Sequence, residues 1–212
     1  MALRIPLFPL GMVLFPGVTV PLHLFEPRYR QMLVDVRDGD RRFGMVYGIP
    51  GVPEAELPQG RAGCVAEITH ISLYPDGRAD IVVTGRERFV FTQLLEDEAP
   101  YHVAEVEPLP DATDTTTMAL MLSADDVASR FQRVVAAVRT LNDDTREPPP
   151  LPDDPAQIAY RIASMIDLDL EEQQALLAER SPAARLTRVD AVLRRVLPDL
   201  EIRSAMHRGR AK

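Results

Sequence analysis

The five residues from Phe25 to Tyr29 are the segment of this sequence best suited to contact another molecule. Two aromatic rings could pack against apolar groups of an extended peptide, and Arg28 could hold its polar groups. Phe15 adds another ring upstream in the same apolar stretch. A structural interpretation stays open, because Pro27 can begin a helix in which Phe25 and Tyr29 pack one turn apart. The candidate binding residues are Phe15, Phe25, Glu26, Arg28 and Tyr29.

Patterns that would support catalysis or metal binding are absent from the sequence. The four histidines are scattered without a His-Glu-x-x-His motif, and a single cysteine cannot supply a paired thiolate site. No serine stands in a Gly-x-Ser-x-Gly setting. Most of the acidic pairs come at predicted helix starts, where negative charge complements the helix dipole. We therefore expect no catalytic residue, no metal and no cofactor.

Lysine is almost missing. The chain has 24 basic residues, and the one lysine among them is Lys212 at the carboxyl end. A Walker A loop needs a lysine followed by serine or threonine, and a serine-lysine peptidase needs a buried, deprotonated lysine. A charged chain end meets neither requirement. The sequence thus predicts a protein that is neither an ATPase nor a peptidase.

Composition indicates a globular protein without general affinity for nucleic acid or membranes. Hydrophobic residues make up 46% of the 212 residues, enough for a substantial core. The net charge of -8 argues against binding to phosphate backbones. Prolines interrupt the apolar stretch over residues 6–33, which excludes a signal-peptide core or a spanning helix. We expect a cytoplasmic location and an inert, buried thiol at Cys64.

Turn and strand signals place a β-rich unit over residues 1–110. Phe15-Pro16-Gly17 predicts a tight corner, and Pro75-Asp76-Gly77 predicts a hairpin turn between two β-rich runs. A helix is expected to begin at Pro27. Because prolines limit strand pairing, the chain near Pro16 and Pro21 should lie at a sheet edge.

The spacing of apolar residues predicts a helical unit over residues 111–212. Capping and proline signals mark four helix starts, at Ser123, Asp154-Pro155, Asp169 and Ser181-Pro182. A proline-rich run over residues 145–154 is expected to connect two of these helices. We interpret the apolar stripes of the helices as core and not as a groove for a partner.

An ordered series of motifs resembles the amino-terminal domain of the ATP-dependent protease Lon. The motifs are FPLGMVLFPGVTVPLHLFEPRYRQML, RRFGMV, GCVAEI, YPDGRADIVVTGRERFVF and DLEEQQALLAERSPAARLTRVDAVLRR. The resemblance runs from about Ile5 to Ile202, and the FEPRY form looks most like relatives that consist of this domain alone. It implies an α+β fold in which a PUA-like β pseudobarrel is followed by an α-helical bundle. It also implies a part in recognising unfolded protein substrates.

Three function hypotheses follow. The leading one is a non-catalytic module that binds unfolded or apolar polypeptide segments as an adaptor or holdase, and that could work with a separate protease or ATPase. The alternative is an RNA-binding PUA-like module, whose local support is the arginine-rich carboxyl-terminal part of the chain. Its arginines include Arg185, Arg188, Arg194, Arg195, Arg208 and Arg210. A peptidase is implied by the family name alone.

Overall fold

The computed structural model forms two compact units, each described here by itself. The first combines residues 1–110 with 168–178, and the second combines residues 111–167 with 179–212. The described residues are 2–96, 98–113, 117–147 and 150–210. Lys212 and two residues of the predicted proline-rich connector, 148 and 149, therefore lie outside them.

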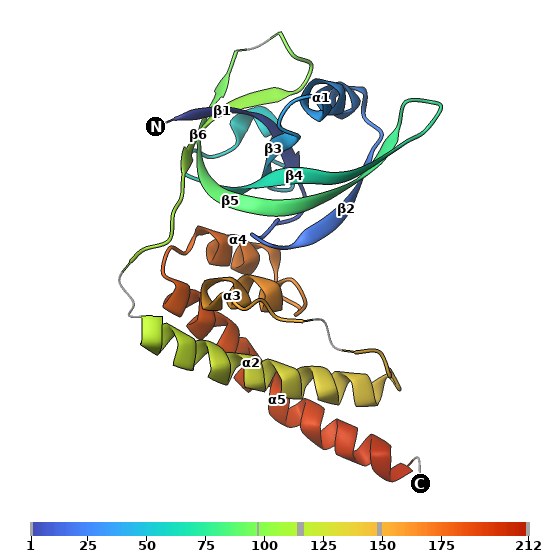
Figure 1. The fold of residues 1–212 in the computed structure, drawn as a ribbon, viewed down its shortest axis with the longest axis vertical. Coiled ribbons are helices and arrows are strands. Elements are labelled where there is room, and N and C mark those ends of the chain that lie inside the picture. Colours follow the sequence, from blue (N-terminus) through green and yellow to red (C-terminus); the bar gives the residue numbers. More distant parts are fainter. Residues whose placement is uncertain (1, 97, 114–116, 148–149, 211–212) are drawn as a thin grey trace. The chain divides into compact units, whose positions relative to one another are not determined.

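The first unit is a ring of β-strands with one further strand at its edge (Figure 1). Its strands are β1 (Leu3–Leu10), β2 (Thr19–Leu24), β3 (Arg42–Tyr47), β4 (Ala62–Leu73), β5 (Ala79–Leu95) and β6 (His102–Pro108). The sheet order is β2-β5-β4-β3-β1-β6, and an additional pairing of β5 with β6 closes the ring. Within the described chain, β2 pairs with β5 alone. The predicted α+β class and the sheet-edge position of the chain near Pro21 are confirmed.

The helix predicted from Pro27 is also confirmed. α1 (Pro27–Arg37) has proline in its first turn, where the missing N–H costs no hydrogen bond. Its inward face follows the helical period, with Tyr29, Met32, Leu33 and Val36 all buried. The short 3-10 helix η1 (Glu54–Glu56) lies between β3 and β4.

Gly17 and Gly85 meet where the corner before β2 touches the middle of β5. Gly17 has a φ of 72°, and its N–H donates to the Gly85 carbonyl at 2.9 Å. A Cβ on Gly85 would come within 2.1 Å of the Phe15 carbonyl oxygen, so no larger residue fits there. The corner predicted at residues 15–17 is confirmed. It works because the facing strand also has a glycine.

The core of the first unit includes side chains from several strands and the η1 region. One buried cluster comprises Leu7, Val46, Leu57, Phe89, Phe91, Ala104 and Val106. Cys64 is also fully buried, and burial raises the pKa of its thiol to about 12. The thiol is therefore not ionised at neutral pH, as the sequence predicted.

α4 (Leu170–Ala178) packs on the β-strands of the first unit, although the sequence placed it with the other helices. The Gln174 side-chain amide donates to the Ala62 carbonyl at 2.9 Å. Arg88 donates to the Leu177 carbonyl at 2.7 Å. The helical unit predicted over residues 111–212 is thus interrupted, because α4 directs its buried residues and its polar contacts towards the strands.

The second unit contains α2 (Thr117–Leu141), α3 (Pro155–Ala163) and α5 (Pro182–Arg210). Two of its predicted starts are confirmed by side-chain caps. The Asp154 carboxylate accepts from the Ala156 N–H at 3.0 Å, and the Ser181 hydroxyl accepts from the Ala184 N–H at 3.3 Å. The start predicted at Ser123 was wrong, because α2 already begins at Thr117. Methionine, alanine and leucine precede Ser123, and these strong helix formers carry the helix further back.

A buried arginine joins several segments of the second unit. Arg185 has no exposed surface, and its guanidinium donates to both Asp111 carboxylate oxygens at 2.5 and 2.8 Å. It also donates to the carbonyls of Ala156 and Glu179 and lies 4.4 Å from the centre of the Tyr160 ring. Arg185 therefore does not contribute to a solvated basic face.

No helix within the described ranges combines the length and the apolar run that a bilayer crossing requires.

Candidate functional site

Exposed aromatic rings gather where β2 ends beside the β4–β5 hairpin. We call His23, Phe25 and Tyr74 the aromatic patch. Phe25 is 60% exposed and Tyr74 is 41% exposed, which is unusual for such large apolar rings. The His23 ring centre lies 6.1 Å from that of Phe25 in a stacked arrangement and 6.1 Å from that of Tyr74 in an edge-on one. The patch therefore presents adjoining ring surfaces to solvent.

Strand register brings the patch together. His23 pairs with Asp80 across β2 and β5, and Asp80 pairs with Ser72 across β5 and β4. Side chains alternate between the two faces of a sheet, so Phe25 and Tyr74, each two residues further on, extend the same face. Leu22 and Leu24 occupy the opposite face of β2 and are buried.

Asp80 holds two of the three patch residues in place. Its Oδ1 lies 2.6 Å from the His23 Nδ1, and its Oδ2 accepts a hydrogen bond from the Tyr74 hydroxyl. The hydrogen bond from Tyr74 and then that from His23 lower the pKa of the Asp80 carboxyl. The hydrogen bond between Tyr74 and Asp80 also raises the pKa of the Tyr74 hydroxyl. A binding partner would meet rings whose rotational freedom is already reduced, which lowers the entropy cost of binding.

Arg28, a predicted contact residue, is engaged within the first unit. Its guanidinium donates to the Glu54 carboxylate through two bonds, at 2.6 and 2.9 Å, and to Glu26 at 3.0 Å. The hydrogen bond to Glu54 is the main reason that the pKa of Arg28 is raised. His102 also lies within 3.2 Å of Glu54. Arg28 and Glu26 are only partly exposed, and their charges are already paired.

Phe15 and Tyr29 need correction as surface contacts, because both are core residues. Tyr29 is 2% exposed, and its ring centre lies 3.9 Å from that of Phe8. Burial is the main cause that raises the pKa of its hydroxyl, which lies 3.4 Å from each Glu54 carboxylate oxygen. Phe15 is 1% exposed. Of the five predicted contacts, Phe25 is the one whose side chain is largely free to meet a partner.

Sequence reasoning missed His23 and Tyr74. His23 precedes Phe25 by two residues, so a strand predicted over this segment would have placed both side chains on one face. No comparable signal links either residue to Tyr74, which lies about fifty positions later. Their proximity depends on the register in which β2, β5 and β4 pair.

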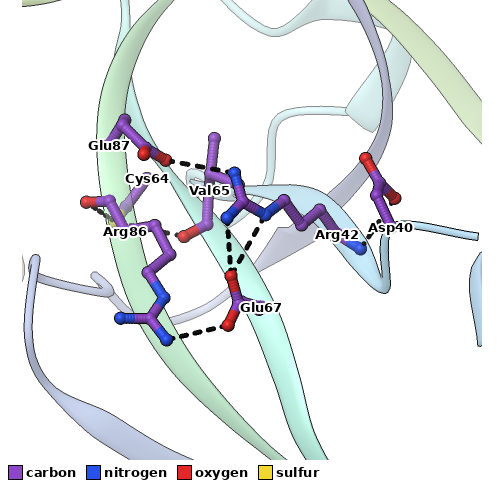
Figure 2. A network of polar contacts seen from close by, with 7 residues as sticks. All are labelled: Asp40, Arg42, Cys64, Val65, Glu67, Arg86 and Glu87. Carbon is purple, nitrogen blue, oxygen red and sulfur yellow. Dashed lines mark hydrogen bonds and ion pairs between the residues drawn. The ribbon is translucent and has the colours of Figure 1, made fainter.

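A separate polar network crosses β3, β4 and β5 (Figure 2). The Glu67 carboxylate accepts from Arg42 at 2.7 Å on one oxygen and from Arg86 at 2.8 Å on the other. These bonds, with Arg86 as the larger contribution, lower the pKa of Glu67. Arg42 also lies 3.7 Å from Glu87. Because the charges already pair with one another, we interpret the network as a cross-strand tie.

Each unit also has a shallow hollow. In the first unit, the residues that line a hollow of about 450 Å³ include Val36, Val65, Phe89, Arg42 and Glu87. In the second unit, an apolar groove of about 520 Å³ runs between α2 and α5. Among the described residues, histidine, cysteine and acidic side chains form no group of three that could hold a metal ion. We therefore take the aromatic patch, with its exposed rings, and not either hollow as the candidate site.

Three of the six arginines that supported an RNA-binding alternative are buried or already paired with carboxylates. Arg185 is buried, Arg194 lies 2.6 Å from Asp190, and Arg188 lies 3.4 Å from Glu179. Carboxylates thus offset these charges within the second unit. Nothing in this geometry supports the RNA-binding alternative.

Comparisons with known proteins agree on one family. The family model of the ATP-dependent protease La (LON) substrate-binding domain matches residues 4–195. Lon protease 1 of Herpetosiphon aurantiacus is 28% identical over 91% of this chain, and the Lon protease of Cytophaga hutchinsonii is 26% identical over 96%. The match covers 24% and 25% of those proteins, so the chain spans about a quarter of their length.

The solved structures that are similar to this chain include two Lon N-terminal domains. A Lon N-terminal domain protein from Xanthomonas campestris has a TM-score of 0.63 at 27% identity, covering 89% of this chain and 98% of that one. The N-terminal domain of Mycobacterium avium complex Lon protease has a TM-score of 0.65, covering 90% and 97%. At 16% identity, the second likeness shows the fold alone.

Proposed function

This chain belongs to the ATP-dependent protease La (LON) substrate-binding domain family, and we propose that it acts as a polypeptide-recognition module whose contact surface is the aromatic patch. Family membership supports a part in substrate recognition. The finer proposal is that the module is non-catalytic and captures exposed apolar segments of unfolded proteins. It would act as a holdase, or as an adaptor that passes its clients to a separate protease or ATPase.

The 60% exposure of Phe25 is the observation that carries the proposal. A large apolar ring that is exposed to water gains free energy when the apolar side chains of a partner cover it. Aromatic residues also contribute strongly to many binding surfaces. His23 and Tyr74 enlarge the ring surface, and their hydrogen bonds to Asp80 fix its shape. The patch also adjoins an edge strand, which extended segments use in peptide recognition.

A binding titration tests the proposal. We expect a fluorescent, carboxymethylated polypeptide that cannot fold to bind the wild-type protein, and Phe25→Ala to weaken this binding by about 1 kcal/mol or more. Ile202→Ala is the matched control, since Ile202 is a similarly exposed apolar residue, at 57%, and belongs to α5 of the second unit. Equal loss of affinity in both variants would contradict the proposal.

Two further measurements separate the neighbouring hypotheses. A holdase should reduce light scattering by an aggregating client without ATP, whereas a pure adaptor should bind the client without this effect. Single-stranded RNA, titrated at two salt concentrations, should show no specific binding. Tight RNA binding that weakens steeply with salt would instead favour the nucleic-acid hypothesis.

A further inference from the structure

The outer edge of β2 carries backbone groups that point away from β5. Pro21 has no N–H, and its pairing partner is Val82. In an antiparallel pair, alternate residues direct both backbone groups to the neighbouring strand. The Gly85 N–H donates to the Val18 carbonyl at 2.9 Å, which sets the phase of this alternation. Val20, Leu22 and Leu24 therefore face β5, while Thr19, Pro21 and His23 direct their backbone groups outward.

Side-chain contacts confirm this phase independently. Side chains approach more closely across pairs that lack backbone hydrogen bonds. The Thr19 and Thr84 hydroxyls lie 2.9 Å apart, and His23 lies 2.6 Å from Asp80. Both contacts fall on the pairs that the alternation assigns as not hydrogen-bonded by the backbone.

The outward groups of Thr19, Pro21 and His23 have no hydrogen-bond partner among the described residues. Thr19 and His23 each offer an N–H and a carbonyl, and Pro21 offers a carbonyl alone. Backbone groups at a strand edge are a template for a further strand. An extended peptide backbone has the complementary donors and acceptors at the same spacing.

We propose that this edge receives a client polypeptide as an added β-strand, a mode that rests on the proposed recognition of polypeptides and specifies its substrate as extended segments. Every second side chain of the added strand would lie on the same face of the sheet as His23 and Phe25. Segments with an apolar or aromatic residue at alternate positions would therefore bind best. A preformed helix would not, since its backbone bonds are already internal.

Pro21 argues for a client and against a second copy of this chain as the occupant. The longest symmetric pairing of two β2 edges places Pro21 opposite Pro21. Each Pro21 carbonyl would then face the proline nitrogen of the other copy, which has no hydrogen to donate. A client residue with an ordinary N–H donates to the Pro21 carbonyl and avoids this loss. Proline at a strand edge thus discourages self-association while leaving the edge open to other chains.

Single N-methylation of a bound peptide tests the backbone pairing with the wild-type protein. The probe is a fluorescein-labelled heptapeptide of alternating valine and threonine with one central phenylalanine, followed by fluorescence anisotropy. Methyl groups at alternate positions should weaken binding about 2- to 10-fold, the worth of one hydrogen bond, and the intervening positions should have little effect. Binding that is equally sensitive or insensitive at all positions overturns the added strand but leaves polypeptide recognition standing.

A pair of protein variants gives an independent reading. Thr19→Pro removes an outward N–H, whereas Thr19→Val keeps it and removes the hydroxyl that contacts Thr84. With unfolding midpoints measured for both, Thr19→Pro should bind the peptide about 2- to 10-fold more weakly than Thr19→Val. Equal affinities overturn the proposal, as does a wild-type dimer that Thr19→Pro dissociates. No binding of the peptide or of the unfolded polypeptide would overturn the proposed function as well.

Discussion

His23 and Asp80 face each other across β2 and β5, with the imidazole Nδ1 2.6 Å from the carboxylate Oδ1. This contact strengthens the pairing of β2 with β5 near the end of β2, one residue before Phe25. Because the same carboxylate also accepts from Tyr74, one acidic side chain joins β2 to the β4–β5 hairpin. We infer that Asp80 is a positioning residue for the aromatic patch.

Replacing Asp80 should change how stability depends on pH. The pKa of its carboxyl lies below the ordinary value of 3.8, so ionisation stabilises the folded state above that pH. This stabilisation is lost as the pH falls through the lowered pKa. Asp80→Asn should therefore be less stable than wild type at pH 7, and the difference should shrink as the pH falls below about 3.8 and vanish below the lowered pKa. Melting temperatures across pH check this, and a gap that persists in acid would contradict it.

Tyr29 and Phe25 should respond in opposite ways to alanine. Tyr29→Ala should reduce the free energy of unfolding by about 3 kcal/mol or more, because a buried ring is removed from the core. Client affinity should be unchanged in the folded variant. Phe25→Ala should leave stability within about 0.5 kcal/mol, because its ring is exposed. Urea unfolding and the binding titration give both quantities, and weaker client binding by folded Tyr29→Ala would restore Tyr29 as a contact.

Gly85 and Gly11 should differ sharply in their tolerance of alanine. A Cβ at Gly85 meets the Phe15 carbonyl, whereas a Cβ at Gly11 has no atom within 4 Å. Gly85→Ala should therefore destabilise the protein by about 2 kcal/mol or more through overpacking. Gly11→Ala should be close to neutral. Chemical unfolding of both variants measures this difference, and a neutral Gly85→Ala would show that the corner has room to move.

Removing Arg185 should be costly because its buried guanidinium donates to the Asp111 carboxylate and to the carbonyls of Ala156 and Glu179. We expect Arg185→Met to lower the free energy of unfolding by about 3 kcal/mol, since the acceptors around a buried charged group lose their donor. Adding Asp111→Asn should recover part of the loss. Arg203→Met is the control on the same helix, because Arg203 is exposed and its ion pair is worth little. Similar losses in the two arginine variants would argue against this account.

The purified chain should neither hydrolyse ATP nor cleave casein. The physical reason is the lack of an interior lysine, which both a phosphate-binding loop and a serine-lysine pair require. Phosphate release and fluorescent casein cleavage are the assays. Substitution of each serine in turn is the control for a contaminant, because turnover that a single serine variant abolishes would belong to this chain.

Local features of the fold could be predicted from the sequence because they depend on neighbouring residues. Proline at the start of α1 and apolar residues at helical spacing specified both the beginning of that helix and its buried face. The helix start predicted at Asp169 is confirmed, and Asp169 and Glu172 cap α4 reciprocally, at 2.7 and 3.3 Å. Ser123 failed as a start because a capping signal competes with the helix propensity of the residues before it.

Tertiary structure decided which side chains are buried and which meet at the candidate site. Tyr29 and Phe25 look alike in the sequence, yet Phe8 and Glu54 enclose Tyr29 while Phe25 remains in solvent. α4 reads as one more amphipathic helix, and only contacts with distant strands assign it to the first unit. The sequence by itself determined turns, caps and helix faces, since these follow from local dihedral angles and hydrogen bonds. Burial and the aromatic patch required the strand register, because they depend on residues far apart in the chain.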